Sequence, residues 1–199
     1  MLTVAIASEF HAFDGEIYRY LLERILDIKV QAWKSEIEFN GCKHVRKQAG
    51  LYLESAARDG VRHALIAIDN DGGSKRGLPH EPDHQVAQEV ANPDGCRVCW
   101  LLDTVPASWR ADAYRSCVVV PVQTLETWLL FLQGDQLRDP PESVFYRPHL
   151  KKLFFGNPLP PEDKRTAMAL EVLRRDGAIS KLRERRSFRL FEEQLADWK

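Results

Sequence analysis

Residues 63–73 read HALIAIDNDGG, and this stretch gives the clearest indication of the fold class. Residues 64–68 form an uninterrupted apolar run, as expected for a strand of a parallel sheet that is covered on both faces. Asp69 and Asp71 follow at once, with Asn70 between them, and two glycines come next. Ligands of parallel α/β sheets bind beyond the carboxyl ends of the strands, so two carboxylates at a strand end indicate a site there.

The rest of the chain alternates between strand and helix patterns. Strands are expected at 2–8, 29–39, 61–69, 96–103 and 115–123, and helices at 16–26, 42–60, 83–91 and 124–133. Gly60 would end the second helix, and Thr124 would cap the fourth. Such alternation predicts a Rossmann-like α/β fold, a mainly parallel sheet with helices on both faces. We expect an α/β core at 1–135. A Pro-rich connection and a basic, C-terminal helical extension at 136–199 would pack on the core as one domain.

The composition indicates a single globular domain and argues against several other classes of protein. The chain has 199 residues, of which 44% are hydrophobic, enough for a single well-packed domain. No run of 18 apolar residues is present, and the N-terminal MLTVAIASEF lacks a basic region, so we expect a cytoplasmic protein without a membrane span. Cys96 and Cys99 form a C-x-x-C pair, but no second ligand pair follows, which favours core or loop residues over zinc or redox chemistry.

Further carboxylates are expected at the same sheet edge. Glu9 ends the first strand, Asp103 ends the fourth, and Glu126 lies in the first turn of the helix after the fifth. Carboxylates gathered there would repel one another unless a cation neutralised them, and their hard oxygens suit Mg²⁺ or Mn²⁺. If the backbone stays extended, Asp69 and Asp71 point to one side. A loop held by Asx-turns is the structural alternative.

The ordered motifs resemble a known family. VAIASEFHAFDGEIYRYLLERIL, ALIAIDNDGG, VVVPVQTLETWLL and SFRLFEEQL together resemble the Toprim-like DUF4276 family, which is akin to the nuclease Toprim domain of OLD-type (overcoming lysogenisation defect) proteins. The resemblance implies a Toprim-like fold and a metal-dependent nuclease or related phosphotransfer site. It also implies a place in bacterial anti-phage defence beside an ATPase partner protein, since this chain has no G-x-x-x-x-G-K-[ST] motif of its own.

The resemblance also assigns roles to residues. Glu9 matches the glutamate that acts as acid/base or metal ligand, Asp69 and Asp71 match the metal-binding pair, and Glu126 matches the glutamate of an E-x-W motif. Glu16 matches a second acidic position. The family pattern has Gly directly after the first glutamate, whereas Phe10 stands here. The catalytic lysine of OLD-type sites has no assured match; Lys75 is the first candidate, and Lys151 or Lys152 the next.

Basic residues are concentrated in the C-terminal tail. Residues 164–189 hold nine basic and three acidic side chains, a balance of +6 in a chain of net charge −1. Such asymmetry is typical of a surface that binds nucleic-acid phosphates, and a solvated helical face is the alternative. The expected nucleic-acid contacts are Arg174, Arg175, Lys181, Arg183, Arg185 and Arg186. His11, His80 and His84 fit exposed loop positions better than metal ligation.

The sequence thus predicts a Mg²⁺- or Mn²⁺-dependent nuclease that acts on DNA or RNA. Its expected site comprises Glu9, Asp69, Asp71 and Glu126, with Lys75 or Lys152 at the phosphate. Two alternatives remain open. One is a non-catalytic, Toprim-like subunit that binds a partner of an ATPase complex, and the other is a flavodoxin-like phosphoacceptor or phosphatase built on Asp69, Thr104 and Lys75. Whether the protein forms a homo-oligomer also stays open.

Overall fold

A computed structural model describes residues 1–69, 97–110, 112–121, 124–134 and 150–198 of the chain. These residues belong to two compact units. The sheet unit comprises Met1–Ile68, Leu101–Val119 and Leu190–Lys199, and the helical unit comprises Asp69–Trp100 and Val120–Arg189. No helix within the described ranges is long and apolar enough to cross a membrane.

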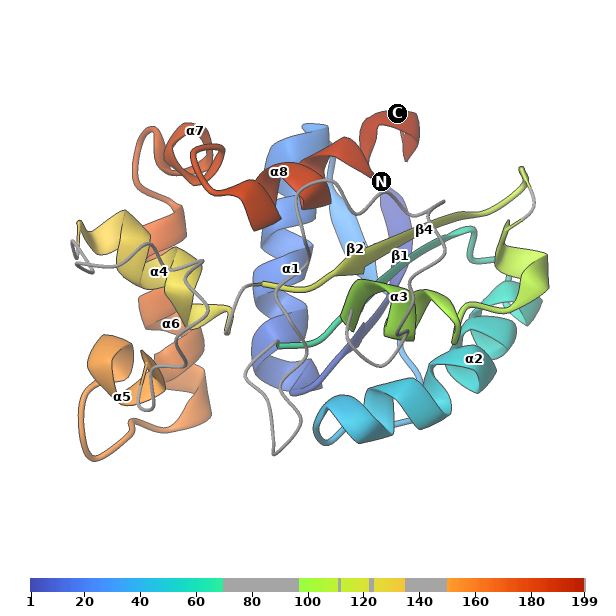
Figure 1. Cartoon of the computed structure of the whole chain (residues 1–199), viewed down its shortest axis with the longest axis horizontal. Helices are drawn as coiled ribbons and strands as arrows, with labels where there is room; N and C mark the ends of the chain where they lie inside the picture. The colour runs from blue at the N-terminus through green and yellow to red at the C-terminus, as the bar shows by residue number, and fades with distance from the viewer. Residues whose placement is uncertain (70–96, 111, 122–123, 135–149, 199) are drawn as a thin grey trace. The chain divides into compact units, whose positions relative to one another are not determined.

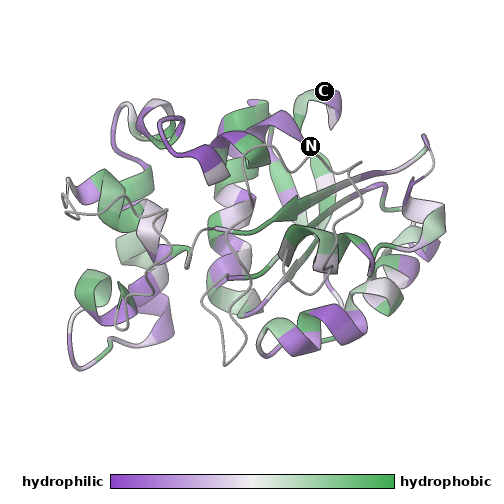
Figure 2. Ribbon diagram, in the orientation of Figure 1, coloured by the Kyte–Doolittle hydropathy of each residue, from purple (hydrophilic) through white to green (hydrophobic). Residues whose placement is uncertain are grey.

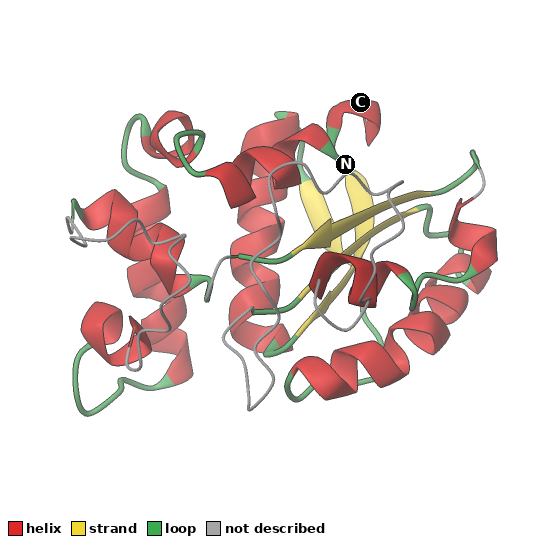
Figure 3. Cartoon of the chain, viewed as in Figure 1, coloured by secondary structure: helices red, strands yellow, loops and turns green. Residues whose placement is uncertain are grey.

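The sheet unit is built on four parallel strands. They are β1 (Leu2–Ser8), β2 (Val30–Ala32), β3 (His63–Ala67) and β4 (Arg115–Val119). Their order is β2-β1-β3-β4, and the register pairs Ser8 with Ala67 and Ala67 with Val119. The expected α/β class and parallel sheet are therefore confirmed, and Figure 3 shows the strands among the helices.

Two long helices link the first three strands. They are α1 (His11–Leu26) and α2 (Cys42–Arg58). Across the sheet, the step from β1 to β2 runs in one direction and the step from β2 to β3 runs in the opposite direction. Because both crossovers are right-handed, the two helices lie on opposite faces of the sheet (Figure 1). The second helix ends where the sequence predicts, since Gly60 follows with a φ of 82° that a side chain disfavours.

The central strands are covered on both faces and form the core of the sheet unit. Val4, Ala5, Ile6 and Ala7 of β1 are all fully buried, and Figure 2 shows the hydrophobic character of the central strands. The continuous apolar pattern follows from this two-sided burial. From α2, the buried hydroxyl of Tyr52 donates a hydrogen bond of 3.1 Å to the carbonyl of Ile6, which ties the helix to the strand.

The C-terminal segment covers the outer side of the edge strand β4. It contains the end of α8 (Arg186–Glu193) and the short 3₁₀ helix η2 (Ala196–Trp198). The side-chain amide of Gln194 accepts from the N–H of Val118 at 3.0 Å and donates to its carbonyl at 2.9 Å. A side chain thus supplies the hydrogen bonds that a fifth strand would have made.

Two expected strands differ from the structure. The fourth, at 96–103, is wrong, because residues Arg97–Leu102 form the helix α3 (Figure 3). A short apolar run is compatible with a buried helix turn as well as a strand, and here Leu101 is the buried residue. Asp103 follows this helix, is exposed, and does not stand at a strand end. The second expected strand, 29–39, is reduced to the three residues of β2.

The helical unit contains α4 (Glu126–Gln133), α5 (Leu150–Phe155), α6 (Glu162–Leu173) and α7 (Ala178–Leu182). The helix α4 packs against each of the other three, and its residues 126–130 and 132 are buried. The expected helix at 124–133 and the helical character of the tail are confirmed. The expected helix at 83–91 lies outside the described residues. In the sheet unit, the 3₁₀ helix η1 (Ala107–Arg110) precedes β4.

Candidate metal and phosphate site

Asp69 lies next to the start of α4. Its Oδ1 accepts a hydrogen bond of 3.0 Å from the backbone N–H of Leu125, the residue directly before Glu126. Two carboxylates that are far apart in the sequence are therefore neighbours in the helical unit. The expected cap of α4 by Thr124 is wrong, because its hydroxyl has no hydrogen-bond partner among the described residues and no side chain caps the helix. Asp69 instead binds the N–H of Leu125, the residue before the helix.

Glu126 is a buried carboxylate with a lysine partner. Its side chain is 4% exposed, and its Oε1 lies 3.9 Å from Nζ of Lys151 on α5. This distance is that of an ion pair and not of a short hydrogen bond. Lys152, the neighbouring residue expected at the phosphate, is exposed. The lysine that accompanies the acidic site in the helical unit is therefore Lys151.

The position of Glu126 is fixed by the other side of α4. The indole Nε1 of Trp128 donates a hydrogen bond of 2.9 Å to Oγ of Ser187. Its ring meets Phe188 edge to face at 5.2 Å between centroids. Trp128 therefore holds α4 in place through packing, which restricts how far the Glu126 side chain can shift.

Glu9 lies in the sheet unit, directly after β1. Its side chain is almost buried, with 9% exposed, and its backbone carbonyl accepts a hydrogen bond of 3.1 Å from the N–H of Gly41. The preceding residue, Ser8, is fully buried, and its hydroxyl finds no hydrogen-bond partner in the described part of the chain. Glu9 belongs to the sheet unit, whereas Asp69 belongs to the helical unit.

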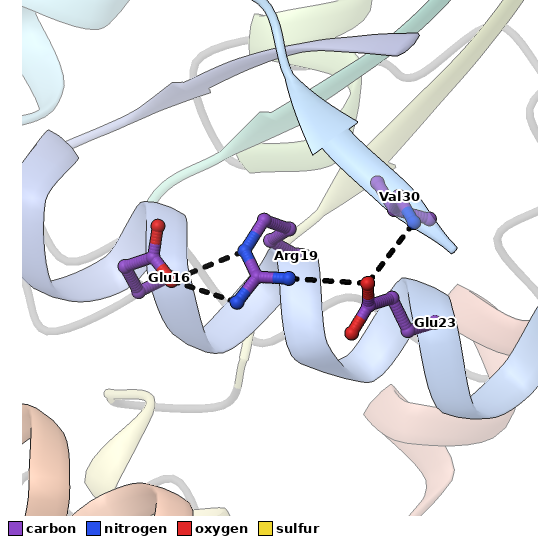
Figure 4. A network of polar contacts seen from close by, with 4 residues as sticks. All are labelled: Glu16, Arg19, Glu23 and Val30. Carbon is purple, nitrogen blue, oxygen red and sulfur yellow. Dashed lines mark hydrogen bonds and ion pairs between the residues drawn. The ribbon is translucent and has the colours of Figure 1, made fainter. Parts of the chain in front are cut away.

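Glu16 belongs to a network along α1 (Figure 4). Its carboxylate accepts hydrogen bonds from Nε and Nη2 of Arg19, at 3.1 and 2.9 Å. Arg19 also contacts Glu23 at 3.2 Å, and Glu23 accepts from the N–H of Val30 at 3.1 Å. The hydrogen bond from Arg19 to Glu16 is the main cause of a raised pKa of Arg19. The network joins α1 to the start of β2, so Glu16 has a structural role there.

Several expected site residues lie outside the described residues. They are Asp71, Lys75, His80, His84 and Cys96. Within the described ranges, no group of three or more His, Cys, Asp and Glu side chains is arranged to hold a metal ion. The expected set of Glu9, Asp69 and Asp71 therefore remains a prediction. Cys99, the described cysteine of the C-x-x-C pair, lies on α3 and is half-buried.

The basic residues of the tail differ in their exposure. Arg174, Arg175 and Arg183 are exposed, whereas Lys181, Arg185 and Arg186 are half-buried. Two of the latter lie over the ring of Phe131 on α4. The guanidinium carbon of Arg185 is 3.7 Å from the ring centroid, and Nζ of Lys181 is 5.0 Å away. Cation–π contact with Phe131 therefore holds two of the expected phosphate-binding groups in place.

No local sequence pattern indicates the Phe131 contact or the choice of Lys151 over Lys152. Both depend on which sides of α4, α5 and α7 meet. No family model matches this sequence, and searches of curated proteins and of solved structures found no significant match either.

Proposed function

We propose that this protein is a Mg²⁺- or Mn²⁺-dependent nuclease with a Toprim-like fold that hydrolyses phosphodiesters in DNA or RNA. The observation that carries the proposal is the hydrogen bond from Leu125 to Asp69, which makes Asp69 and the buried Glu126 neighbours.

The donor atoms fit a hard divalent cation. Glu9, Asp69 and Asp71 would hold the metal through carboxylate oxygens. The hydroxyl of Ser8, which has no hydrogen-bond partner among the described residues, adds an oxygen at the end of β1. When bound, such a metal activates water and stabilises the charge that builds up on phosphorus. Glu126 completes the acidic set and orients a ligand.

The basic residues have separate tasks in this proposal. Lys151 compensates the charge of Glu126 and is the described lysine best placed to meet a phosphate, while Lys75 and Lys152 remain candidates from the sequence. The exposed Arg174, Arg175 and Arg183 hold the sugar-phosphate backbone by charge, so binding falls as salt rises and depends little on sequence. By its resemblance, the protein would act with an ATPase partner in anti-phage defence.

A specific observation favours one alternative. Asp69 accepts from a helix N–H and Glu126 pairs with Lys151, so both carboxylates already have partners within the protein. A non-catalytic Toprim-like subunit that binds the ATPase partner would keep these contacts for stability alone. The two functions differ in one property, since only the nuclease needs the negative charge of Asp69.

The experiment compares Asp69→Asn with Asp69→Ala. Asparagine keeps an Oδ1 acceptor for Leu125 and removes the charge, whereas alanine removes both. We expect Asp69→Asn to fold like the wild type and to lose Mn²⁺ binding in calorimetry, together with cleavage of plasmid and single-stranded DNA. Asp103→Asn, an exposed carboxylate outside the site, is the control. Full metal-dependent cleavage by Asp69→Asn would refute the proposal. If the wild type itself showed no metal-dependent cleavage, the non-catalytic subunit would be favoured.

A further inference from the structure

We propose that Phe10 and a basic face of α2 form a surface that binds a single strand of nucleic acid beside Glu9. The basic face consists of Lys43, His44, Arg46 and Lys47. The proposal rests on the proposed nuclease function and deepens it, because it names the form of the substrate. It concerns residues of the sheet unit only.

The four residues of the basic face lie on the outer side of α2. All four are exposed, whereas Val45, Ala49 and Tyr52 of the same helix are buried. Position 43 is about one turn from both 46 and 47 and is therefore their neighbour on the helix surface, and 44 neighbours 47 in the same way. Figure 2 shows strongly hydrophilic residues in the first half of this helix. Lys43, Arg46 and Lys47 therefore form a cluster of positive charge at one end of α2, with His44 beside it.

This cluster opposes the stability of its own helix. The start of a helix carries partial positive charge, so cations there are unfavourable, and Lys43 and Lys47 repel each other at i,i+4 spacing. The first turn of α2 contains no acidic residue, whereas the first turn of α6 contains Glu162 and Asp163. No described carboxylate forms a salt bridge with Lys43 or Lys47. A local conflict of this kind is typical of a functional surface, and a polyanion would relieve it.

The basic face is held next to the candidate carboxylate. Gly41, directly before α2, donates its N–H to the carbonyl of Glu9 at 3.1 Å, and Asn40 forms a β-bridge with Phe10. The helix therefore starts at the point where β1 ends. Phosphates bound by the first turns of α2 would lie near the end of β1, where the proposed chemistry takes place.

Phe10 supplies an apolar surface at the same place. Its side chain is 46% exposed, although its backbone N–H is fixed by a 3.0 Å hydrogen bond to Asp14. Exposed aromatic rings stack on unpaired bases, and every base offers such a face. A duplex keeps its bases paired and stacked inside, so a combination of one exposed ring and a row of cations fits a single strand better.

The test measures binding of short, fluorescein-labelled oligothymidylate and oligouridylate by anisotropy in EDTA, so that no metal-dependent cleavage occurs. Phe10→Ala and Phe10→Leu should weaken binding about 5- to 150-fold, the range for loss of one stacked base, while Phe10→Tyr should retain it. Lys43→Ala combined with Lys47→Ala should reduce the slope of log K against log salt by about 1.4, or about 0.7 for each phosphate that is no longer neutralised.

Two controls match these variants. Leu51→Ala removes an exposed apolar side chain that lies on α2, away from Phe10 in the sequence, and Arg24→Ala with Lys29→Ala removes two exposed cations at the end of α1 and just before β2. Neither control should change binding. Unchanged binding by Phe10→Ala, binding of the matched duplex as tightly as the single strand, or equal competition by polyglutamate would each overturn the proposal. Strand binding that depends on Phe10, without any metal-dependent cleavage, would support this surface and reject the nuclease function.

Discussion

Replacement of Gln194 by glutamate tests whether the C-terminal segment stabilises the edge of the sheet. The Gln194 amide makes three hydrogen bonds. Its Oε1 accepts from the N–H of Val118 at 3.0 Å, and its Nε2 donates to the carbonyls of Val118 and Leu190, each at 2.9 Å. In Gln194→Glu the carboxylate keeps the accepted bond but cannot make either donated one, and its charge faces two carbonyl oxygens.

The expected cost follows from these hydrogen bonds. A part-buried hydrogen bond contributes about 1 kcal/mol, and an acceptor left without a donor adds to the destabilisation. Removal of two such bonds therefore predicts a decrease of about 2–3 kcal/mol in the free energy of unfolding, or about 4–12 °C in Tm for a chain of this size. Urea denaturation followed by tryptophan fluorescence should show a lower midpoint with an unchanged slope.

The loss of stability in Gln194→Glu should depend on pH. The protonated carboxyl can donate to a carbonyl and the ionised one cannot, so the folded protein should raise the pKa of the introduced group above its unfolded value of about 4.3. The deficit relative to wild type should then be smallest below about pH 4.3 and grow as pH rises through the folded pKa. The exposed Gln31→Glu is the control. Equal midpoints for wild type and Gln194→Glu at neutral pH would show that the donated hydrogen bonds of Gln194 do not stabilise the edge of the sheet.

Two further predictions concern titratable groups of the sheet unit. Burial, and secondarily the charge of Arg115, lowers the pKa of His63, whose ring meets Trp198 at 5.2 Å. His63 is therefore protonated more readily in the unfolded chain than in the folded protein. The wild type should lose stability relative to His63→Phe as pH falls below about 6.5. Stability curves of the two proteins that run parallel with pH would contradict this prediction. Burial also raises the pKa of the Cys117 thiol, so a thiol reagent followed by mass spectrometry should label Cys42 in the native protein and Cys117 only after unfolding. Equal labelling rates of Cys42 and Cys117 in the native protein would contradict this prediction.

Local patterns were sufficient for the elements that are long or covered on both faces. The apolar run at 64–68 predicts β3, because a strand buried on two sides needs no polar alternation. The helical spacing of apolar residues, followed by Gly60, predicts the end of α2 to within two residues. Both the helical period and the glycine that ends the helix are visible in consecutive residues. The run at 97–102 is too short to show a period, and there the sequence predicted a strand where the chain forms α3.

Short-range patterns were enough to predict the α/β class, the parallel sheet and the carboxylates that follow its strands, because periodicity and strand ends are properties of neighbouring residues. Tertiary packing set three contacts: Asp69 binds the N–H of Leu125 before α4, Lys151 and not Lys152 pairs with Glu126, and Gln194 completes the edge of β4. These contacts join residues far apart in the chain or depend on which side of a helix is buried. Both are set by how elements pack, a property that no local pattern contains.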